Sequence, residues 1–283
     1  MPKKRITPPS NVKNKIVVIE ESFPTVSETF ILDQITGLID LGFEIENWAF
    51  NKLNPAAVHK NIIKYKLDEC TKYFNLPSAR LHAVPGEWFR KFQELNPSVS
   101  IRTSDVFHVH FGTSFINLQP LFMKFPNRVV VSFHGYDASQ MINNHGNKIY
   151  AFLFERADLI TTPSREMKKR LVEAGCNENK IVVHHYGIDL NLFKKKESEN
   201  NPEIRILTVA RLVEKKGILN SLKAFSKLSD KRKIKYKLIG EGPLENEIRT
   251  AIRNLNLNNY LEIIPFLPKE KIAEEMSNSD IYL

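Results

Sequence analysis

Segments with the pattern of a buried strand alternate with segments that have the pattern of a helix along most of this chain. This alternation limits the possible folds more than any other feature, because it is typical of parallel α/β sheets joined by right-handed crossovers. The strand-like segments are short and rich in apolar residues. We expect strands at residues 15–20, 43–50, 105–111, 128–133, 159–162, 181–184, 204–210, 235–239, 260–264 and 280–283.

The helices are indicated by apolar residues that recur every three or four positions. The first helix is expected to begin at Ser27 as its N-cap, with Glu28 in its first turn, and to end at Gly42. Residues 55–97 have helical apolar spacing around 62–67 and 88–95, but prolines interrupt it and the element order there stays open. The other expected helices are 148–156, 165–174, 218–228, 244–255 and 269–276.

A charged, asparagine-rich stretch at residues 191–203 has no apolar periodicity and is the best candidate for a domain boundary. It divides the chain into residues 1–190 and 191–283, and each part contains its own strand–helix alternation. A length of 283 residues is sufficient for two α/β domains with cores of their own. We therefore predict two Rossmann-like parallel-sheet domains.

Composition and charge narrow the classes of partner. The chain has 42% apolar and 26% charged residues, which is typical of a globular protein, and no apolar run approaches the roughly 20 residues that span a bilayer. The first residues are basic but lack the apolar segment of a secretory signal, and the two cysteines are far apart, so we expect a cytoplasmic protein without a disulfide framework. The net charge of +9 favours phosphorylated ligands or an anionic membrane surface; no nucleic-acid-binding motif is present, and nucleic acid is not expected as a partner.

The segment Ile204–Leu219 combines a strand, a cationic loop and the start of a helix. Arg211 and Lys216 lie in this loop, where free backbone N–H groups and the helix dipole favour an anion. A solvated charged turn is the alternative for an isolated pair of this kind. Gly240 and Gly242 form a second tight strand-to-helix turn after strand 235–239, and two such loops in one half-sheet favour a nucleotide site.

In the first domain, histidines gather where strands end. His108 and His110 are two residues apart in a strand and therefore point to one face, while His134 follows strand 128–133, with Asp137 close by. Three histidines at adjacent strand ends favour a pocket in which they donate hydrogen bonds or act as a general acid or base, although a single such histidine is more often structural. Zinc is the weaker alternative, because no third ligand has suitable spacing, and we predict no metal site.

A basic group, Lys168, Lys169 and Arg170, lies on the expected helix 165–174. A solvated helix face is the simpler interpretation of these three side chains. A peripheral contact with an anionic membrane is the sharper alternative.

Several segments, in a fixed order over nearly the whole length, resemble retaining glycosyltransferases of family 4, which have the two-domain GT-B architecture. The loop that contains SETFI is similar to the polysaccharide-biosynthesis branch, which includes colanic-acid-type transferases. The matching segments are FPTVSETFI (23–31), VHF (109–111), SFHGYD (132–137), KIVVHHYGIDLNLF (180–193), TVARLVEKKGI (208–218), IGEGPL (239–244) and SDIYL (279–283).

This resemblance implies a nucleotide-sugar donor, UDP- or GDP-linked, bound mainly by the second domain, and a glycan or lipid-linked acceptor bound by the first. Arg211 and Lys216 match the pair that neutralises the donor diphosphate, and Gly240 and Gly242 match the loop that passes the nucleoside. His134 matches a residue near the transferred sugar. Asp137 and Ser27 are further candidates, for the catalytic and the donor-binding site respectively, and no separate cofactor is implied.

In the family, the strand that matches residues 280–283 is followed by a helix whose two glutamates, seven residues apart, contact the donor. We expect this chain to stop before them, so that its second domain is incomplete and its activity weak or absent. Two alternatives stay open: a non-catalytic fragment or split-gene subunit that binds nucleotide or a partner, and a GT-B sugar-nucleotide epimerase. The SETFI and TVARLVEKKG segments argue against the epimerase.

Overall fold

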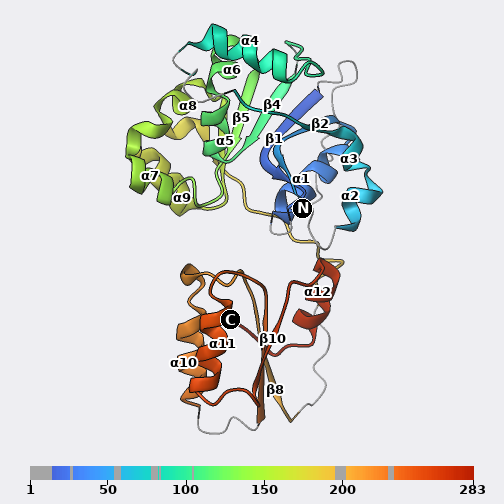
Figure 1. Ribbon diagram of the computed structural model, residues 1–283, viewed down its shortest axis with the longest axis vertical. Helices are drawn as coiled ribbons and strands as arrows, with labels where there is room; N and C mark the ends of the chain where they lie inside the picture. Colours follow the sequence, from blue (N-terminus) through green and yellow to red (C-terminus); the bar gives the residue numbers. More distant parts are fainter. Residues whose placement is uncertain are drawn as a thin grey trace, which may run out of the picture. The chain divides into compact units, whose positions relative to one another are not determined.

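The computed structural model describes residues 15–25, 28–53, 59–77, 82, 84–103, 105–194, 202–228 and 233–283. The chain divides into two compact units, residues 1–187 and residues 188–283 (Figure 1). Each unit is built on a parallel sheet of its own. None of the helices in these residues is long and apolar enough to span a bilayer.

The sheet of the first unit has seven parallel strands in the order β3-β2-β1-β4-β5-β6-β7. The chain adds strands in one direction from β1 to β3 and in the other direction from β4 to β7, so the order reverses between β1 and β4. Ligands of open parallel sheets bind at such a reversal, outside the carboxyl ends of the strands. The strands are β1 (Lys15–Phe23), β2 (Glu44–Lys52), β3 (Thr71–Tyr73), β4 (Val106–His110), β5 (Arg128–Ser132), β6 (Leu159–Thr162) and β7 (Ile181–Val183).

Helices cover both faces of this sheet because successive strand residues point to opposite sides. One face packs against α1 (Thr29–Asp40), α2 (Lys60–Lys64) and α3 (Leu67–Cys70). The larger core lies on the other face, under α4 (Pro85–Leu95), α5 (Gly112–Asn117), α6 (Gln119–Lys124) and α8 (Ala151–Arg156). The remaining elements are α7 (Gln140–His145), η2 (Asn147–Tyr150), α9 (Arg165–Glu173) and η3 (Glu178–Lys180).

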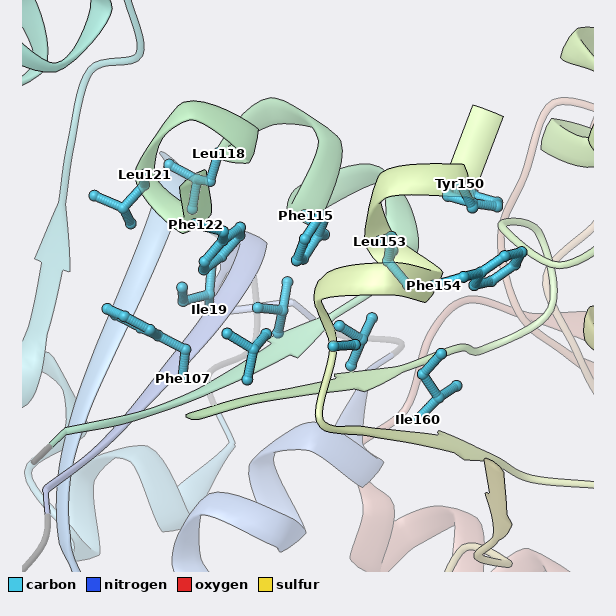
Figure 2. Packing of buried hydrophobic residues seen from close by; sticks show 14 of the residues in the cluster. Ile19, Phe107, Phe115, Leu118, Leu121, Phe122, Tyr150, Leu153, Phe154 and Ile160 are labelled. Atoms are coloured by element: carbon cyan, nitrogen blue, oxygen red, sulfur yellow. The ribbon is translucent and has the colours of Figure 1, made fainter. Parts of the chain in front are cut away.

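Aromatic side chains fill this larger core. Phe115 of α5 stacks on Phe122 of α6 with ring centroids 4.4 Å apart, and Phe122 meets Phe107 of β4 edge-on at 5.7 Å. Figure 2 shows these rings, together with Leu153 and Phe154 of α8, packed over the strands. Since Phe107 faces this core, its neighbours His108 and His110 must face the opposite side of β4.

The second unit has a four-stranded parallel sheet in the order β10-β9-β8-β11, with the reversal between β8 and β11. Figure 1 shows α10 and α11 on one face of this sheet and α12 on the other. The elements are β8 (Ile204–Val209), η4 (Glu214–Lys216), α10 (Ile218–Ser226), β9 (Ile234–Ile239), α11 (Glu245–Asn254), β10 (Leu261–Ile264), α12 (Lys269–Ser277) and β11 (Ile281–Tyr282).

The ten expected strands are all present, each within three residues of its expected bounds, and the α/β fold with two parallel sheets is confirmed. Among the described elements of the first unit, β3, α5, α6, α7 and the short η3 were not expected. The expected helix 148–156 is a 3₁₀ turn followed by α8. Helix α1 begins at Thr29 with Glu28 as its N-cap, not in its first turn, and Ser27 lies outside the described residues.

Candidate functional site

The carboxyl end of the first sheet holds the three predicted histidines, which we call the histidine cluster (His108, His110 and His134). The His108 and His110 rings stack with centroids 4.6 Å apart, and those of His110 and His134 stack at 5.1 Å. Nδ1 of His110 lies 2.9 Å from Nε2 of His134, and Nε2 of His108 lies 2.8 Å from Oγ of Ser132. The strand ends at the reversal therefore bring together the side chains that the sequence predicted to share a pocket.

Burial determines the protonation of the histidine cluster. His108 is 8% exposed and His110 is 1% exposed. Burial, with the nearby His184, lowers the pKa of His108 to about 4, and burial with His108 lowers the pKa of His134 to about 3. Burial and the two neighbouring rings also hold the pKa of His110 well below its ordinary value. All three rings are thus neutral at pH 7, each with one N–H donor and one acceptor nitrogen.

The Asp137 carboxylate holds the loop from which His134 projects. Its Oδ1 accepts backbone N–H bonds from His134, Gly135 and Ala138 at 2.9–3.1 Å, and its Oδ2 accepts one from Gly112 at 3.1 Å. The residue is completely buried; burial raises the pKa of Asp137, and the four N–H donors oppose that rise. Both oxygens are therefore occupied by backbone donors, and the carboxylate connects the loop after β5 with the start of α5.

Tyr186 and Glu20 also belong to this edge of the sheet, although sequence reasoning did not single them out as site residues. The Tyr186 hydroxyl lies 2.6 Å from Nδ1 of His134, and its ring stacks on Phe30 with centroids 4.6 Å apart. Glu20 is 2% exposed and accepts a 2.7 Å hydrogen bond from Nδ2 of Asn47; burial and the charge of Glu28 raise its pKa to about 8. A glutamate at the end of the apolar run KIVVIE was the available signal for Glu20. Tyr186 lies in the matching segment KIVVHHYGIDLNLF, but that match alone does not assign it a role in the site.

The loop that follows β8 lies at the reversal of the second sheet. Arg211 and Lys216 are both exposed in this loop, and neither has an ion-pair partner among the described residues. Gly217 ends the turn η4 with a φ of 65° and precedes the N-terminus of α10, where unpaired N–H groups favour an anion. The two predicted cations thus accompany a helix N-terminus, as the sequence indicated.

Gly240 and Gly242 are placed against this same loop. A Cβ at Gly240 would come within 1.9 Å of the Ala210 carbonyl oxygen, and Gly240 also has a φ of 146°. A Cβ at Gly242 would come within 2.6 Å of the Leu212 oxygen, and the Leu212 N–H donates to the Glu241 carbonyl at 2.9 Å. Contact between the two loops therefore already requires both glycines, independently of any ligand.

Two further expectations concern metal and membrane. In the part of the chain that the structure describes, no group of three or more His, Cys, Asp or Glu side chains could hold a metal ion. The basic group on α9 is paired with glutamates: Lys168 with Glu178 at 3.2 Å, Lys169 with Glu173 at 3.8 Å, and Arg170 with Glu166 at 3.3 Å. These pairs reduce the net positive charge that this helix offers to an anionic surface.

Comparisons with known proteins give two family matches that together span most of the chain. Residues 27–192 match the family described as Glycosyltransferase Family 4, and residues 190–283 match the family described as Glycosyl transferases group 1. The chain is 29% identical to the putative colanic acid biosynthesis glycosyltransferase WcaL of Escherichia coli, over 92% of this chain and 72% of that protein. It is 30% identical to the amylovoran biosynthesis glycosyltransferase AmsK of Erwinia amylovora, over 95% of this chain and 74% of that protein.

Among solved structures, HepE of Anabaena in complex with UDP and glucose has a similar fold. The TM-score is 0.67 at 16% identity, and the match covers 95% of this chain and 73% of that one. At this identity the likeness concerns the fold, which is of the GT-B class with a parallel sheet in each unit.

The neutral histidine cluster predicts that stability falls with acidification. An unfolded histidine has a pKa near 6.5, so between pH 6.5 and about 4 the unfolded chain binds protons that the folded cluster does not. Each ring therefore lowers the free energy of unfolding by up to about 1.4 kcal/mol per pH unit of acidification. Glu20 acts oppositely, because its raised pKa contributes stability that is complete below about 4.5 and is lost as pH rises through about 8.

Urea unfolding between pH 7 and pH 5 measures this slope. His134→Gln should make it shallower and Glu20→Gln should make it steeper. His145→Gln, at an exposed histidine, is the control and should leave the slope unchanged. A slope that is the same in His134→Gln and in the unaltered chain would contradict burial of a neutral ring.

Gly240→Ala is expected to destabilise the second unit by about 2–4 kcal/mol, because the methyl group would overlap the Ala210 carbonyl at a positive φ. Gly37→Ala is the matched control: it makes the same chemical change inside α1, where no atom lies within 4 Å of the added carbon, and should be neutral or stabilising by up to about 1 kcal/mol. Thermal unfolding followed by circular dichroism compares the two. Equal stability of Gly240→Ala and the unaltered chain would show that the loops do not meet as described.

Proposed function

The chain belongs to glycosyltransferase family 4, and from this membership we propose that it transfers a sugar from a nucleotide-sugar donor to a glycan or lipid-linked acceptor in surface-polysaccharide biosynthesis. The relatives named for colanic acid and amylovoran biosynthesis support the process. The observation that carries the chemistry is the pair of exposed cations after β8, Arg211 and Lys216, at the reversal of a parallel sheet. The reaction is a hexosyl transfer that retains the configuration at the anomeric carbon.

In this proposal the second unit binds the donor, and Arg211 and Lys216 contact its diphosphate. The bond between the anomeric carbon and the diphosphate oxygen breaks, and the acceptor hydroxyl oxygen bonds to that carbon. The hydroxyl proton leaves with the departing nucleoside diphosphate. Because negative charge develops on the leaving group, two fixed cations lower the energy of the transition state more than that of the bound substrate.

The first unit supplies the acceptor side. We assign His134 to the side of the site that faces the transferred sugar, from its place in the SFHGYD segment. Both of its ring nitrogens are bonded within the first unit, Nε2 to His110 and Nδ1 to the Tyr186 hydroxyl. Asp137 acts as a positioning residue for this ring, because its carboxylate oxygens hold the backbone around it. Ser27 remains a proposed donor-binding residue by its place in the SETFI segment.

The donor is proposed to be UDP- or GDP-linked, and no cofactor apart from this substrate is required. Gly240 and Gly242 are proposed to let the nucleoside approach the same loop that they pack against. The site of action is proposed to be the cytoplasmic side of the cell membrane, with a peripheral contact to anionic lipid.

Titration calorimetry with UDP and with GDP tests the diphosphate assignment. Arg211→Ala and Lys216→Ala should each weaken binding of the preferred nucleotide by roughly tenfold or more, because each removes a charge-assisted hydrogen bond. Lys215→Ala is the matched control: it removes the same charge from the same turn, at an exposed lysine with no ion-pair partner among the described residues. Equal losses in all three variants would mean nonspecific attraction, and unchanged affinity in the first two would remove the assignment.

A further inference from the structure

A chain of hydrogen bonds runs from the interior of the first unit to its surface through His110, His134 and Tyr186. Nδ1 of His110 lies 2.9 Å from Nε2 of His134, and Nδ1 of His134 lies 2.6 Å from the Tyr186 hydroxyl. His110 is 1% exposed, whereas Tyr186 is 43% exposed. The His110 end of this row of hydrogen bonds is therefore buried in the protein, and the Tyr186 end is accessible to a ligand.

Ring packing fixes the geometry of this chain. Phe30 stacks on Tyr186 at 4.6 Å and lies against His134 at 4.8 Å, and Phe111 meets His134 edge-on at 4.6 Å. On the inner side the His108 ring stacks on His110, while its own Nε2 is bonded to Ser132. Phe111 itself has a φ of 68°, an uncommon conformation for a bulky residue that the surrounding structure must maintain. None of the three rings can turn without losing these contacts.

Because the histidines are neutral, the proton position on one ring dictates the position on the next. A neutral imidazole has one N–H and one lone pair, so only two arrangements satisfy both internal hydrogen bonds. In the inward arrangement, Tyr186 donates to His134, His134 donates to His110, and Nε2 of His110 carries a hydrogen. In the outward arrangement, His110 donates from Nδ1 to His134, His134 donates from Nδ1 to Tyr186, and Nε2 of His110 carries a lone pair.

The inner end of the chain distinguishes these two arrangements. Nε2 of His110 is buried and has no hydrogen-bond partner among the described residues. The inward arrangement would bury an unpaired N–H, whereas the outward arrangement buries an unpaired acceptor. Orphaned buried N–H groups are rarer in proteins than under-satisfied acceptors. The outward arrangement is therefore favoured.

We propose that His110 is a positioning residue that fixes His134 in its Nδ1–H form, and that the Tyr186 hydroxyl, which accepts a hydrogen bond from His134, donates a hydrogen bond to an oxygen of the bound sugar. A tyrosine hydroxyl that already accepts one hydrogen bond has its own hydrogen free to point outward. The identity of the ligand oxygen as that of a sugar rests on the proposed function. The positions of the hydrogens along the hydrogen bonds from His110 to Tyr186, which we call the proton order, depend only on the geometry of the first unit.

Long-range proton–nitrogen NMR on the ¹⁵N-labelled protein at pH 7 shows directly which ring nitrogen of each histidine carries the hydrogen. Both His110 and His134 should carry hydrogen on Nδ1 as the predominant form. His110→Gln and His134→Gln each remove one set of signals and so assign the spectrum; through-bond correlations in the unaltered chain give the same assignment without substitution. An Nε2–H form at either ring would overturn the proposal.

A substitution at the outer end tests the link between the rings. Tyr186→Phe keeps the ring that stacks on Phe30 but removes the hydroxyl, and the Nδ1 signal of His134 should shift. Tyr136→Phe is the matched control, since Tyr136 is also exposed and its hydroxyl makes no hydrogen bond to described residues; the His134 signals should stay in place. Unchanged His134 signals in Tyr186→Phe would show that the hydrogen bond does not exist in solution.

The ligand half of the proposal has its own measurement. Tyr186→Phe should lower the rate of sugar transfer about tenfold while leaving the affinity for free UDP or GDP unchanged. An unchanged transfer rate would remove Tyr186 as a donor to the sugar. The NMR measurement of the ring nitrogens needs neither the nucleotide-sugar donor nor the sugar acceptor. A wrong assignment of the ring protons and a wrong transferase proposal therefore give different results.

Discussion

The carboxylate of Asp137 is the single group on which the polar edge of the first sheet depends. It accepts four backbone N–H bonds, three from the loop that follows β5 and one from Gly112 at the start of α5. These bonds hold the ends of β4 and β5 together, and so bring the His134 ring against His110. A charge-assisted hydrogen bond is roughly twice as strong as a neutral one. In this buried site no water could take the place of the carboxylate as the acceptor for the four N–H groups.

The two sheet reversals present opposite kinds of surface. At the first, the histidines and Glu20 are kept uncharged by burial, so that binding there must rely on directed hydrogen bonds. At the second, Arg211 and Lys216 are exposed and have no ion-pair partner among the described residues. In the proposed reaction this division suits the two parts of the donor, because hydroxyl groups are recognised by hydrogen-bond direction and a diphosphate by charge. A buried group of charged side chains lies instead at the amino end of this sheet, where Lys15 pairs with Glu46 and Asp105.

The fold was predictable because its strands and most helices follow the apolar pattern closely. The elements that were missed have specific physical reasons. Pro120 suggests an interruption at residues 112–124, yet it occupies the first turn of α6, where its missing N–H costs nothing. Strand β3 has three residues and no apolar alternation, so only its pairing with β2 defines it. For the site, the spacing of His108 and His110 predicted a shared face, but Tyr186 is separated from His134 by 52 positions, and only the folded chain brings the two together.

The glycines of the second unit show why a motif can be correct in position and ambiguous in meaning. A strand–GxG–helix pattern suggests close approach of the backbone to a nucleotide, but here Gly240 and Gly242 already have close backbone neighbours in Ala210 and Leu212. The contact brings the GxG turn against the loop that carries Arg211. Side chains at either glycine would push that loop away, and with it the Arg211 guanidinium. In the proposed donor site, these glycines would therefore affect anion binding through the position of Arg211, whether or not their own backbone contacts the nucleotide.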